Sequence, residues 1–292
     1  MTGNENAATT PAQRLRALLA EPGVLQAPGC YDAVSARLVA QAGFRAAHLS
    51  GAIASAVGLG LPDLGYLHGS DVAAVARRVT SVSDLPLIAD ADTGYGNALH
   101  VRRTVEQYRE AGVAGLHLED QDFPKRCGHM AGKSVIDGSE AIAKVRAAVE
   151  ADTGLVVIAR TDAMSVLGLD AAIERAAAFA DAGADLVFIE GVTDPERLEI
   201  VHAALPSAGL VVNVSEADPK LRPLAPDVLA GFGVKLAIYP VAPLLAAAHA
   251  LRATYAAIRD DGNATAVPRL TWDELTDLLG LPELLELEER YA

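Results

Sequence analysis

Three carboxylates follow apolar segments of the chain and could together hold a metal ion. Asp90 and Asp92 come directly after the apolar residues 87–89, and Glu119 ends another apolar run. Because Asp90 and Asp92 are two residues apart on a predicted strand, both side chains would point to one face. A few hard oxygen ligands favour Mg²⁺ with retained waters, with Mn²⁺ as a substitute. The alternative is a pair of solvated loop acids, which the apolar residues before them disfavour.

A cysteine lies in a loop-like segment with basic neighbours. Lys125 and Arg126 precede Cys127, and Gly128 and His129 follow it. Cationic neighbours lower the pKa of a thiol and favour the thiolate. A cysteine in a mobile loop can act as acid or base once the loop closes. The alternative is an incidental loop cysteine, so the hypothesis of a catalytic Cys127 depends on its setting.

An arginine ends a third apolar run, where packing does not explain it. Arg160 follows residues 156–159 and is suited to bidentate binding of a substrate carboxylate. An ion pair with Glu190 or Asp162 is the alternative, and the two roles can coexist. Neutral groups for the same carboxylates are predicted at Ser50, Gly51 and Asn213.

The elements that must position these residues alternate between strands and helices. β-rich apolar runs occur at residues 24–27, 46–50, 85–92, 115–120, 155–162, 186–191, 210–215 and 236–240. Amphipathic stretches at residues 33–42, 70–80, 100–111, 139–151, 169–182 and 194–204 lie between them. Gly43, Gly112 and Gly183 each follow an alanine and are predicted to end helices in left-handed turns. Eight such units predict a (β/α)₈ TIM-type barrel, whose strand ends line the active site. A doubly wound sheet is the alternative, but residues 28–32 are not a phosphate loop.

Composition limits the classes of function. The chain has 292 residues and is 51% hydrophobic, enough for one large barrel domain over residues 14–292 after a disordered tail at 1–13. A net charge of −14 disfavours nucleic acid. We expect no membrane span, and two cysteines without a signal segment predict a cytoplasmic protein. Helices after residue 241 exceed what a barrel needs and are candidates for packing on another subunit.

Several motifs together resemble the isocitrate lyase and phosphoenolpyruvate mutase superfamily. They are Asp90-Ala91-Asp92-Thr93-Gly94-Tyr95-Gly96, Leu118-Glu119-Asp120-Gln121 and Lys125-Arg126-Cys127-Gly128-His129. The resemblance covers nearly the whole chain and implies a barrel with a swapped C-terminal helix, usually in tetramers. It implies Mg²⁺ near Asp90, with Asp92 and Glu119 acting largely through water. It also implies binding of a small anionic α-oxycarboxylate and a loop that closes over it.

Within this superfamily, Cys127 makes the loop similar to that of the carbon–carbon lyases. The expected reaction splits a 2-hydroxy di- or tricarboxylate, such as 2-methylisocitrate, into a 2-keto acid and a dicarboxylate, with Cys127 as the acid. The catalytic residues implied are Cys127, His48, Lys125, Arg126 and His129. The substrate contacts implied are Ser50, Gly51, Ala52, Gly128, Arg160, Glu190, Asn213 and Ser215.

Three positions depart from the methylisocitrate lyase pattern and leave the exact reaction open. His48 stands where those enzymes have a tyrosine proposed as base, Ala52 where they have glycine, and Ser215 begins a different tetrapeptide after Asn213. A histidine at that position also resembles carboxyphosphonoenolpyruvate mutase, which forms a carbon–phosphorus bond. An oxaloacetate decarboxylase and a non-catalytic barrel also stay open as hypotheses.

Overall fold

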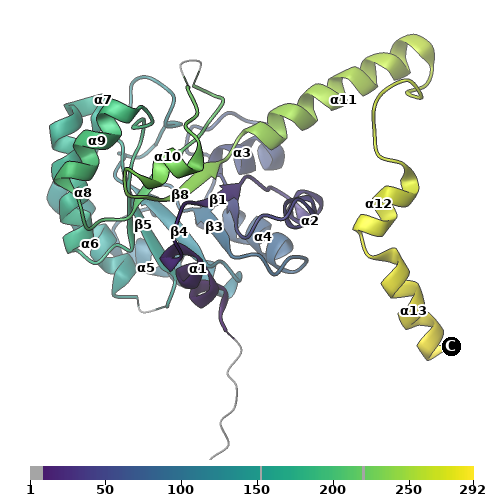
Figure 1. Ribbon diagram of the computed structural model, residues 1–292, viewed down its shortest axis with the longest axis horizontal. Coiled ribbons are helices and arrows are strands. Elements are labelled where there is room, and N and C mark those ends of the chain that lie inside the picture. Colours follow the sequence, from purple (N-terminus) through teal and green to yellow (C-terminus); the bar gives the residue numbers. More distant parts are fainter. Residues whose placement is uncertain (1–8, 152, 219–220) are drawn as a thin grey trace, which may run out of the picture.

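The computed structural model describes residues 9–151, 153–218 and 221–292, and in them eight parallel strands form a barrel (Figure 1). The strands are β1 (Leu25–Pro28), β2 (Ala47–Leu49), β3 (Leu87–Asp90), β4 (Gly115–Glu119), β5 (Val156–Thr161), β6 (Leu186–Ile189), β7 (Leu210–Asn213) and β8 (Val234–Tyr239). Each strand pairs with its sequence neighbour from β2 to β8, and β8 pairs with β1. Between β1 and β2 the barrel closes through a bridge of Gly29 with His48. All eight predicted strands are confirmed, with ends that differ by at most two residues.

Helices follow the strands and surround the barrel. They are α2 (Ala33–Gln41), α3 (Gly51–Leu59), α4 (Gly69–Thr80), α5 (Ala98–Glu110), α6 (Gly138–Val149), α7 (Met164–Leu167), α8 (Leu169–Asp181), α9 (Pro195–Ala204) and α10 (Pro226–Ala230). Gly43, Gly112 and Gly183 have φ of +83°, +79° and +98°, so the predicted left-handed turns are confirmed. The barrel fold is therefore the predicted one.

The interior of the barrel is a packed core. Alternate strand residues point inward and form one apolar cluster, which includes Ile88, Ile158, Phe188, Leu236 and Ile238.

The N-terminal helix closes one end of this core. Helix α1 (Pro11–Ala20) lies at the amino ends of the strands (Figure 1), where fully buried Leu15 packs against Gly115. Thr10 caps α1 and accepts a hydrogen bond from Gln13 N. The predicted tail of residues 1–13 is therefore too long, because the helix already begins at Pro11; residues 1–8 lie outside the described residues.

The C-terminal helices extend away from the barrel. These are α11 (Ala242–Asp261), α12 (Trp272–Leu278) and α13 (Leu281–Tyr291), and none of them has a buried residue. Figure 1 shows α11 projecting outward to the upper right, after which the chain turns and α12 and α13 run downward toward the C-terminus. A hydrogen bond of 3.2 Å from Arg37 Nη1 in α2 to Leu278 O links α12 to the body of the molecule.

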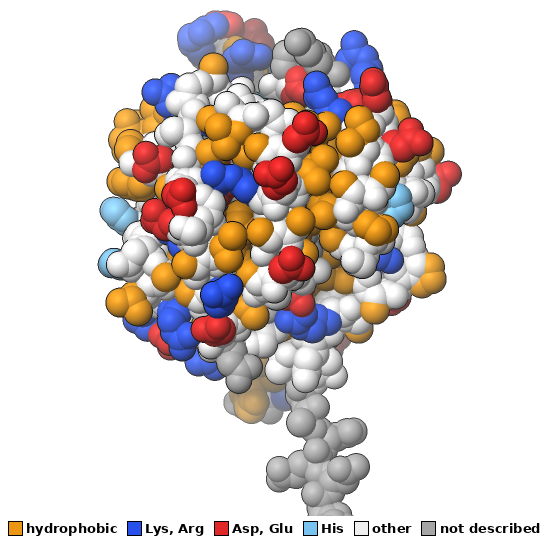
Figure 2. Space-filling model, turned by 90° about the vertical axis from the view of Figure 1, so that its left-hand side faces the viewer, with side chains coloured by type: hydrophobic (Ala, Val, Ile, Leu, Met, Phe, Trp, Pro, Cys, Tyr) orange, Lys and Arg blue, Asp and Glu red, His pale blue; other side chains and the backbone are white. Residues whose placement is uncertain are grey.

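The outer helices present a mixed surface. On the face shown in Figure 2, acidic and basic side chains are interspersed with apolar ones. Within the described part of the chain, no helix combines the length and apolarity that a membrane crossing requires.

Candidate active site

The carboxylates after β3 converge on the start of α3. Asp90 is the last residue of β3, and its Oδ2 accepts a hydrogen bond of 3.0 Å from Gly51 N, the first residue of α3. Asp92 lies beyond the strand with φ of +44°, in the left-handed region. A Cβ on Gly51 would lie 2.9 Å from Asp90 Oδ2 and 3.0 Å from Asp92 Oδ1. The two carboxylates do face one place, but Asp92 reaches it through a left-handed backbone and not through strand alternation, which corrects our prediction.

A buried histidine pair lies beside Asp90. His48 of β2 and His117 of β4 stack with 5.2 Å between ring centroids, and their Nε2 atoms are 2.9 Å apart. His117 Nδ1 is 3.5 Å from Asp90 Oδ1. Burial and then His117 lower the pKa of His48 to about 3. His48 is in register with Ile88, two residues before Asp90, and is 1% exposed. The catalytic role expected of His48 stays a prediction, and its ring already contacts His117 with a pKa lowered to about 3.

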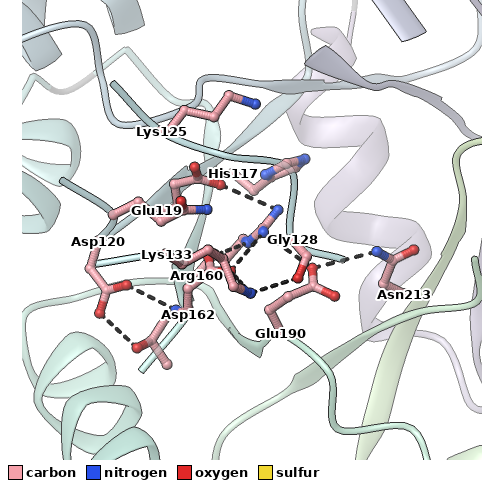
Figure 3. A network of polar contacts seen from close by, with 12 residues as sticks. His117, Glu119, Asp120, Lys125, Gly128, Lys133, Arg160, Asp162, Glu190 and Asn213 are labelled. Carbon is pink, nitrogen blue, oxygen red and sulfur yellow. Dashed lines mark hydrogen bonds and ion pairs between the residues drawn. The ribbon is translucent and has the colours of Figure 1, made fainter. Parts of the chain in front are cut away.

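Arg160 is the centre of a buried ion-pair network (Figure 3). Its Nε and Nη2 donate to Asp162 at 2.9 and 3.1 Å. Glu119 and Glu190 each lie 3.3 Å from the guanidinium, on Nη1 and Nη2. The ion pairs considered in the sequence are thus both present. Because Asp162 occupies the Nε–Nη2 edge, a substrate carboxylate can reach only the remaining Nη protons.

Asn213 extends this network to β7. Its Nδ2 is 3.4 Å from Glu190 Oε2, while its Oδ1 is buried without a hydrogen-bond partner. Asn213 and Glu190 therefore lie where they were expected, next to Arg160, with one acceptor left for a ligand.

The segment after β4 forms the predicted loop, closed over the strand ends. Its two ends are held together: Asp122 N donates to Ser134 O at 3.0 Å, and Gln121 bridges to Val135. The Gln121 amide also binds both backbone groups of Arg126, at 2.8 and 3.0 Å. A Cβ on Gly128 would lie 2.6 Å from Arg160 Nη2 and 2.9 Å from Glu190 Cδ. The centre of the loop therefore rests directly on the arginine network.

Lys125 carries the positive charge of this loop into the site. Its Nζ is 2.5 Å from Asp63 and 2.8 Å from Asp92, and its side chain is 4% exposed. Burial alone would lower the pKa of Lys125, but Asp92 and the neighbouring carboxylates raise it well above its ordinary value. Burial raises the pKa of Asp92, and raises that of Glu119 well above its ordinary value. In this buried site a side chain can therefore stay ionised only where an opposite charge lies close to it.

Cys127 lies in the same loop, and its backbone N donates to Asp63 O at 3.2 Å. Burial raises the pKa of the Cys127 thiol, and this exceeds the lowering by the His129 N–H and the nearby cations. The predicted thiolate is therefore wrong: the thiol stays protonated at neutral pH, as a proton donor must. Cys30 is buried near β1 and outside the loop, as expected.

Some of the predicted site residues make no contact with the carboxylates or with Arg160 among the described contacts. Arg126 is exposed and donates to Ala131 O at 3.2 Å, within the loop, and His129 is also exposed. Their predicted catalytic roles are not supported, because neither side chain contacts the carboxylates. Ser215 is buried, and its Oγ accepts a hydrogen bond from Ala217 N instead. Ser50, the N-cap of α3, is buried beside Gly51, while Ala52 is partly exposed in the first turn of the helix.

Four residues of the site escaped the sequence analysis as functional positions, namely Asp63, His117, Gln121 and Lys133. Asp162 was considered there only as an ion-pair partner of Arg160. His117 shares the inward face of β4 with Glu119, so strand alternation could have found it. Asp63 and Lys133 lie in loops, and no periodicity in the sequence points to them.

A divalent cation of the Mg²⁺ type needs several oxygen ligands around one point. The described residues contain no ready cluster of three or more His, Cys, Asp or Glu side chains around one point. Glu119 Oε1 is, however, buried without a hydrogen-bond partner, and Asp90 and Asp92 converge nearby. These oxygens fit a hard cation that keeps most of its waters.

Several enzymes match this chain over nearly its full length. The 2,3-dimethylmalate lyase of Eubacterium barkeri is 37% identical over 96% of this chain and 98% of its own. A probable 2-methylisocitrate lyase of Corynebacterium glutamicum is 40% identical over 95% and 90%. The chloroplastic carboxyvinyl-carboxyphosphonate phosphorylmutase of Arabidopsis thaliana is 40% identical over 96% and 84%.

Solved structures agree with these matches. Oxaloacetate acetylhydrolase in complex with the inhibitor 3,3-difluorooxalacetate superimposes with a TM-score of 0.91 at 36% identity, covering 97% of both chains. Phosphonopyruvate hydrolase in complex with oxalate and Mg²⁺ superimposes with a TM-score of 0.85 at 32% identity, covering 97% and 99%. The model of the phosphoenolpyruvate phosphomutase family matches residues 15–259, and the chain belongs to this family. The lyases among its relatives make it an enzyme of the lyase type within that superfamily.

Proposed function

We propose that this enzyme cleaves the carbon–carbon bond of a 2-hydroxy di- or tricarboxylate, of the 2-methylisocitrate type. The products would be a 2-keto acid such as pyruvate and a dicarboxylate such as succinate. The observation that carries this proposal is the closed loop that holds Cys127, whose neighbour Gly128 packs directly against Arg160 and Glu190, with a thiol whose pKa is raised by burial. The lyases among the relatives support the same chemistry.

The reaction needs one proton to leave an oxygen and one to arrive at a carbon. Loss of the hydroxyl proton lets that oxygen form the carbonyl of the keto acid while the neighbouring carbon–carbon bond breaks. The electron pair of that bond passes to the second fragment as a carboxylate-stabilised carbanion. Cys127 gives its thiol proton to this carbon, and the proton lost from the hydroxyl replaces it through solvent, so the overall reaction is balanced.

The charged network would bind the substrate rather than react with it. Arg160 keeps Nη protons for one carboxylate, and the free Oδ1 of Asn213 can accept from a substrate hydroxyl. Lys125 balances the negative charge of Asp92. Asp90, Asp92 and Glu119 would hold Mg²⁺, with Mn²⁺ as a substitute, largely through water. When bound, that cation would stabilise negative charge on the substrate oxygens.

The test is a product assay with purified protein and Mg²⁺ on 2-methylisocitrate, 2,3-dimethylmalate and oxaloacetate. We expect keto-acid release from a 2-hydroxy acid, and a loss of at least about 100-fold in kcat for Cys127→Ser, the scale of general acid catalysis. Substrate binding by the variant, measured by calorimetry, should remain. Full activity of Cys127→Ser would contradict the acid role.

Carbon–phosphorus chemistry is the second candidate. It is favoured by His48 and by the 40% identity to the plant phosphorylmutase. Phosphorus NMR after incubation with phosphoenolpyruvate derivatives would detect new carbon–phosphorus signals. Such signals without keto-acid release from hydroxy acids would select the mutase.

We also propose that the enzyme is a homotetramer of helix-swapped dimers in the cytoplasm. Helices α11 to α13 bury no residue, and α13 carries exposed Leu281, Leu284 and Leu285 at helical spacing. A second copy of the chain would cover this stripe. The two free cysteines suit a reducing compartment.

A further inference from the structure

Lys133 is a buried cation that makes two short contacts. Its Nζ lies 2.6 Å from Gly128 O and 2.8 Å from Asp162 Oδ1, and its side chain is 4% exposed (Figure 3). Figure 3 shows its ammonium group pointing at both partners from below the loop. The hydrogen bond to Gly128 O therefore comes from a residue near the C-terminal end of the same loop.

The base from which Lys133 extends is fixed. Its neighbour Ser134 accepts from Asp122 N at 3.0 Å, Val135 bridges to Gln121, and Ile136 N donates to Asp120 O at 2.9 Å. Lys133 therefore extends from the hydrogen-bonded end of the loop to the loop's centre at Gly128.

The second partner of Lys133 connects the loop to the arginine network. Asp162 is fully buried and binds Arg160 through Nε and Nη2 at 2.9 and 3.1 Å. Its backbone is in turn fixed by Asp120, which accepts from Asp162 N at 2.9 Å. One ammonium group thus contacts both the loop carbonyl next to Cys127 and the carboxylate that orients Arg160.

We propose that Lys133 is a positioning residue that couples closure of the Cys127 loop to the orientation of Arg160. With Lys133 in place, the loop carbonyl and Asp162 share one cation, so the closed loop and the oriented guanidinium stabilise each other. Without it, Gly128 O loses a charge-assisted hydrogen bond and Asp162 keeps Arg160 as its remaining cationic contact. This inference rests on the proposed lyase function for its kinetic consequence, but not for its structural one.

Alkylation of Cys127 measures loop opening without any substrate. We would treat native protein, Lys133→Met and Lys144→Met with iodoacetamide and follow each cysteine by peptide mass spectrometry. Lys144 is the control for removal of a buried ammonium, since its Nζ contacts Thr93 O at 3.3 Å and Glu140 Oε1 at 4.0 Å, both outside residues 121–135. We expect Cys127 of Lys133→Met to react about 10- to 100-fold faster, the range set by one hydrogen bond to a charged group. Cys30, 1% exposed, should stay unreactive in all three and reports global unfolding.

Rescue and kinetics separate positioning from simple packing. Lys133→Arg keeps the charge and a donor, so its labelling rate should return to within a few-fold of the native rate. In Lys133→Met, kcat for keto-acid release should fall because Arg160 loses its orientation, and Lys133→Arg should restore it, while Lys144→Met should leave the labelling rate unchanged. If the methionine variant does not fold, Lys133→Gln, which keeps a neutral donor, takes its place in the same comparison.

Three outcomes would overturn the proposal: unchanged Cys127 labelling in the folded variant, equal acceleration in Lys144→Met, or simultaneous labelling of Cys30. Faster labelling with no lyase activity in any protein would support the coupling and refute the proposed function instead.

Discussion

Gly128 is the point at which the closed loop touches the binding network, and adding one methyl group there tests that contact. A Cβ at residue 128 would lie 2.6 Å from Arg160 Nη2 and 2.9 and 3.0 Å from Glu190 Cδ and Cγ. Both side chains are buried and held by ion pairs, so neither can move away cheaply. Overpacking of this kind costs about 1–3 kcal/mol. Because ion pairs hold Arg160 and Glu190 in place, we expect Gly128→Ala to shift the loop outward.

That cost translates into kinetics. If it opposes closure before bond cleavage, kcat/KM falls about 5- to 150-fold. The control is Gly138→Ala at the start of α6, where an added Cβ meets nothing within 4 Å, so its kcat/KM should stay within about twofold of native. Keto-acid release by both variants, with circular dichroism to verify folding, is the assay. A native kcat/KM in Gly128→Ala would refute the idea that this loop closes on Arg160 during turnover.

Four further outcomes are expected. Burial raises the pKa of Cys127 and the protonated thiol is the acid, so kcat should hold below that pKa and fall as the pH rises through it; a pH–kcat profile checks this. Burial raises the pKa of Cys30 from 9.0 to about 12. The free energy of unfolding should therefore fall as the pH rises from 9.0 to about 12, by up to about 1.4 kcal/mol per pH unit, and urea unfolding of Cys30→Ala should lack that slope. Tyr108→Phe removes the hydroxyl that donates to Asp90 O at 2.7 Å and should lower the free energy of unfolding by about 1–3 kcal/mol in urea titrations. Deleting residues 263–292 should turn the expected tetramer into smaller species in light scattering, and a full-length monomer would contradict the proposed swap.

The barrel could be predicted because its signals are local. Each strand is an apolar run of the right length, and Gly43, Gly112 and Gly183 mark helix ends by backbone preference alone. The convergence of Asp90, Glu119 and Arg160 followed from the rule that strand ends meet at one end of the barrel.

The chemistry of individual groups could not be predicted in the same way, because it depends on burial and on partners distant in sequence. Lys125 and Arg126 beside Cys127 suggested a thiolate, yet burial outweighs them. The partner of His48 is His117, 69 residues away, and no local pattern in the sequence pairs them. The residues next to a charged side chain in the sequence do not determine whether that side chain points into the site of the folded loop.

The pairing of charges in the site bears on both the expected divalent cation and the class of substrate. The three cations nearest the loop centre, Lys125, Lys133 and Arg160, are each already matched to carboxylates of this chain. Among the described residues of this network, the protein therefore offers little surplus positive charge to a di- or tricarboxylate. A divalent cation would supply it, so we expect chelation of Mg²⁺ to abolish substrate binding in calorimetry and not only turnover. Tight binding without a divalent cation would show that the arginine network alone recognises the substrate. It would also remove this argument that the substrate is a di- or tricarboxylate.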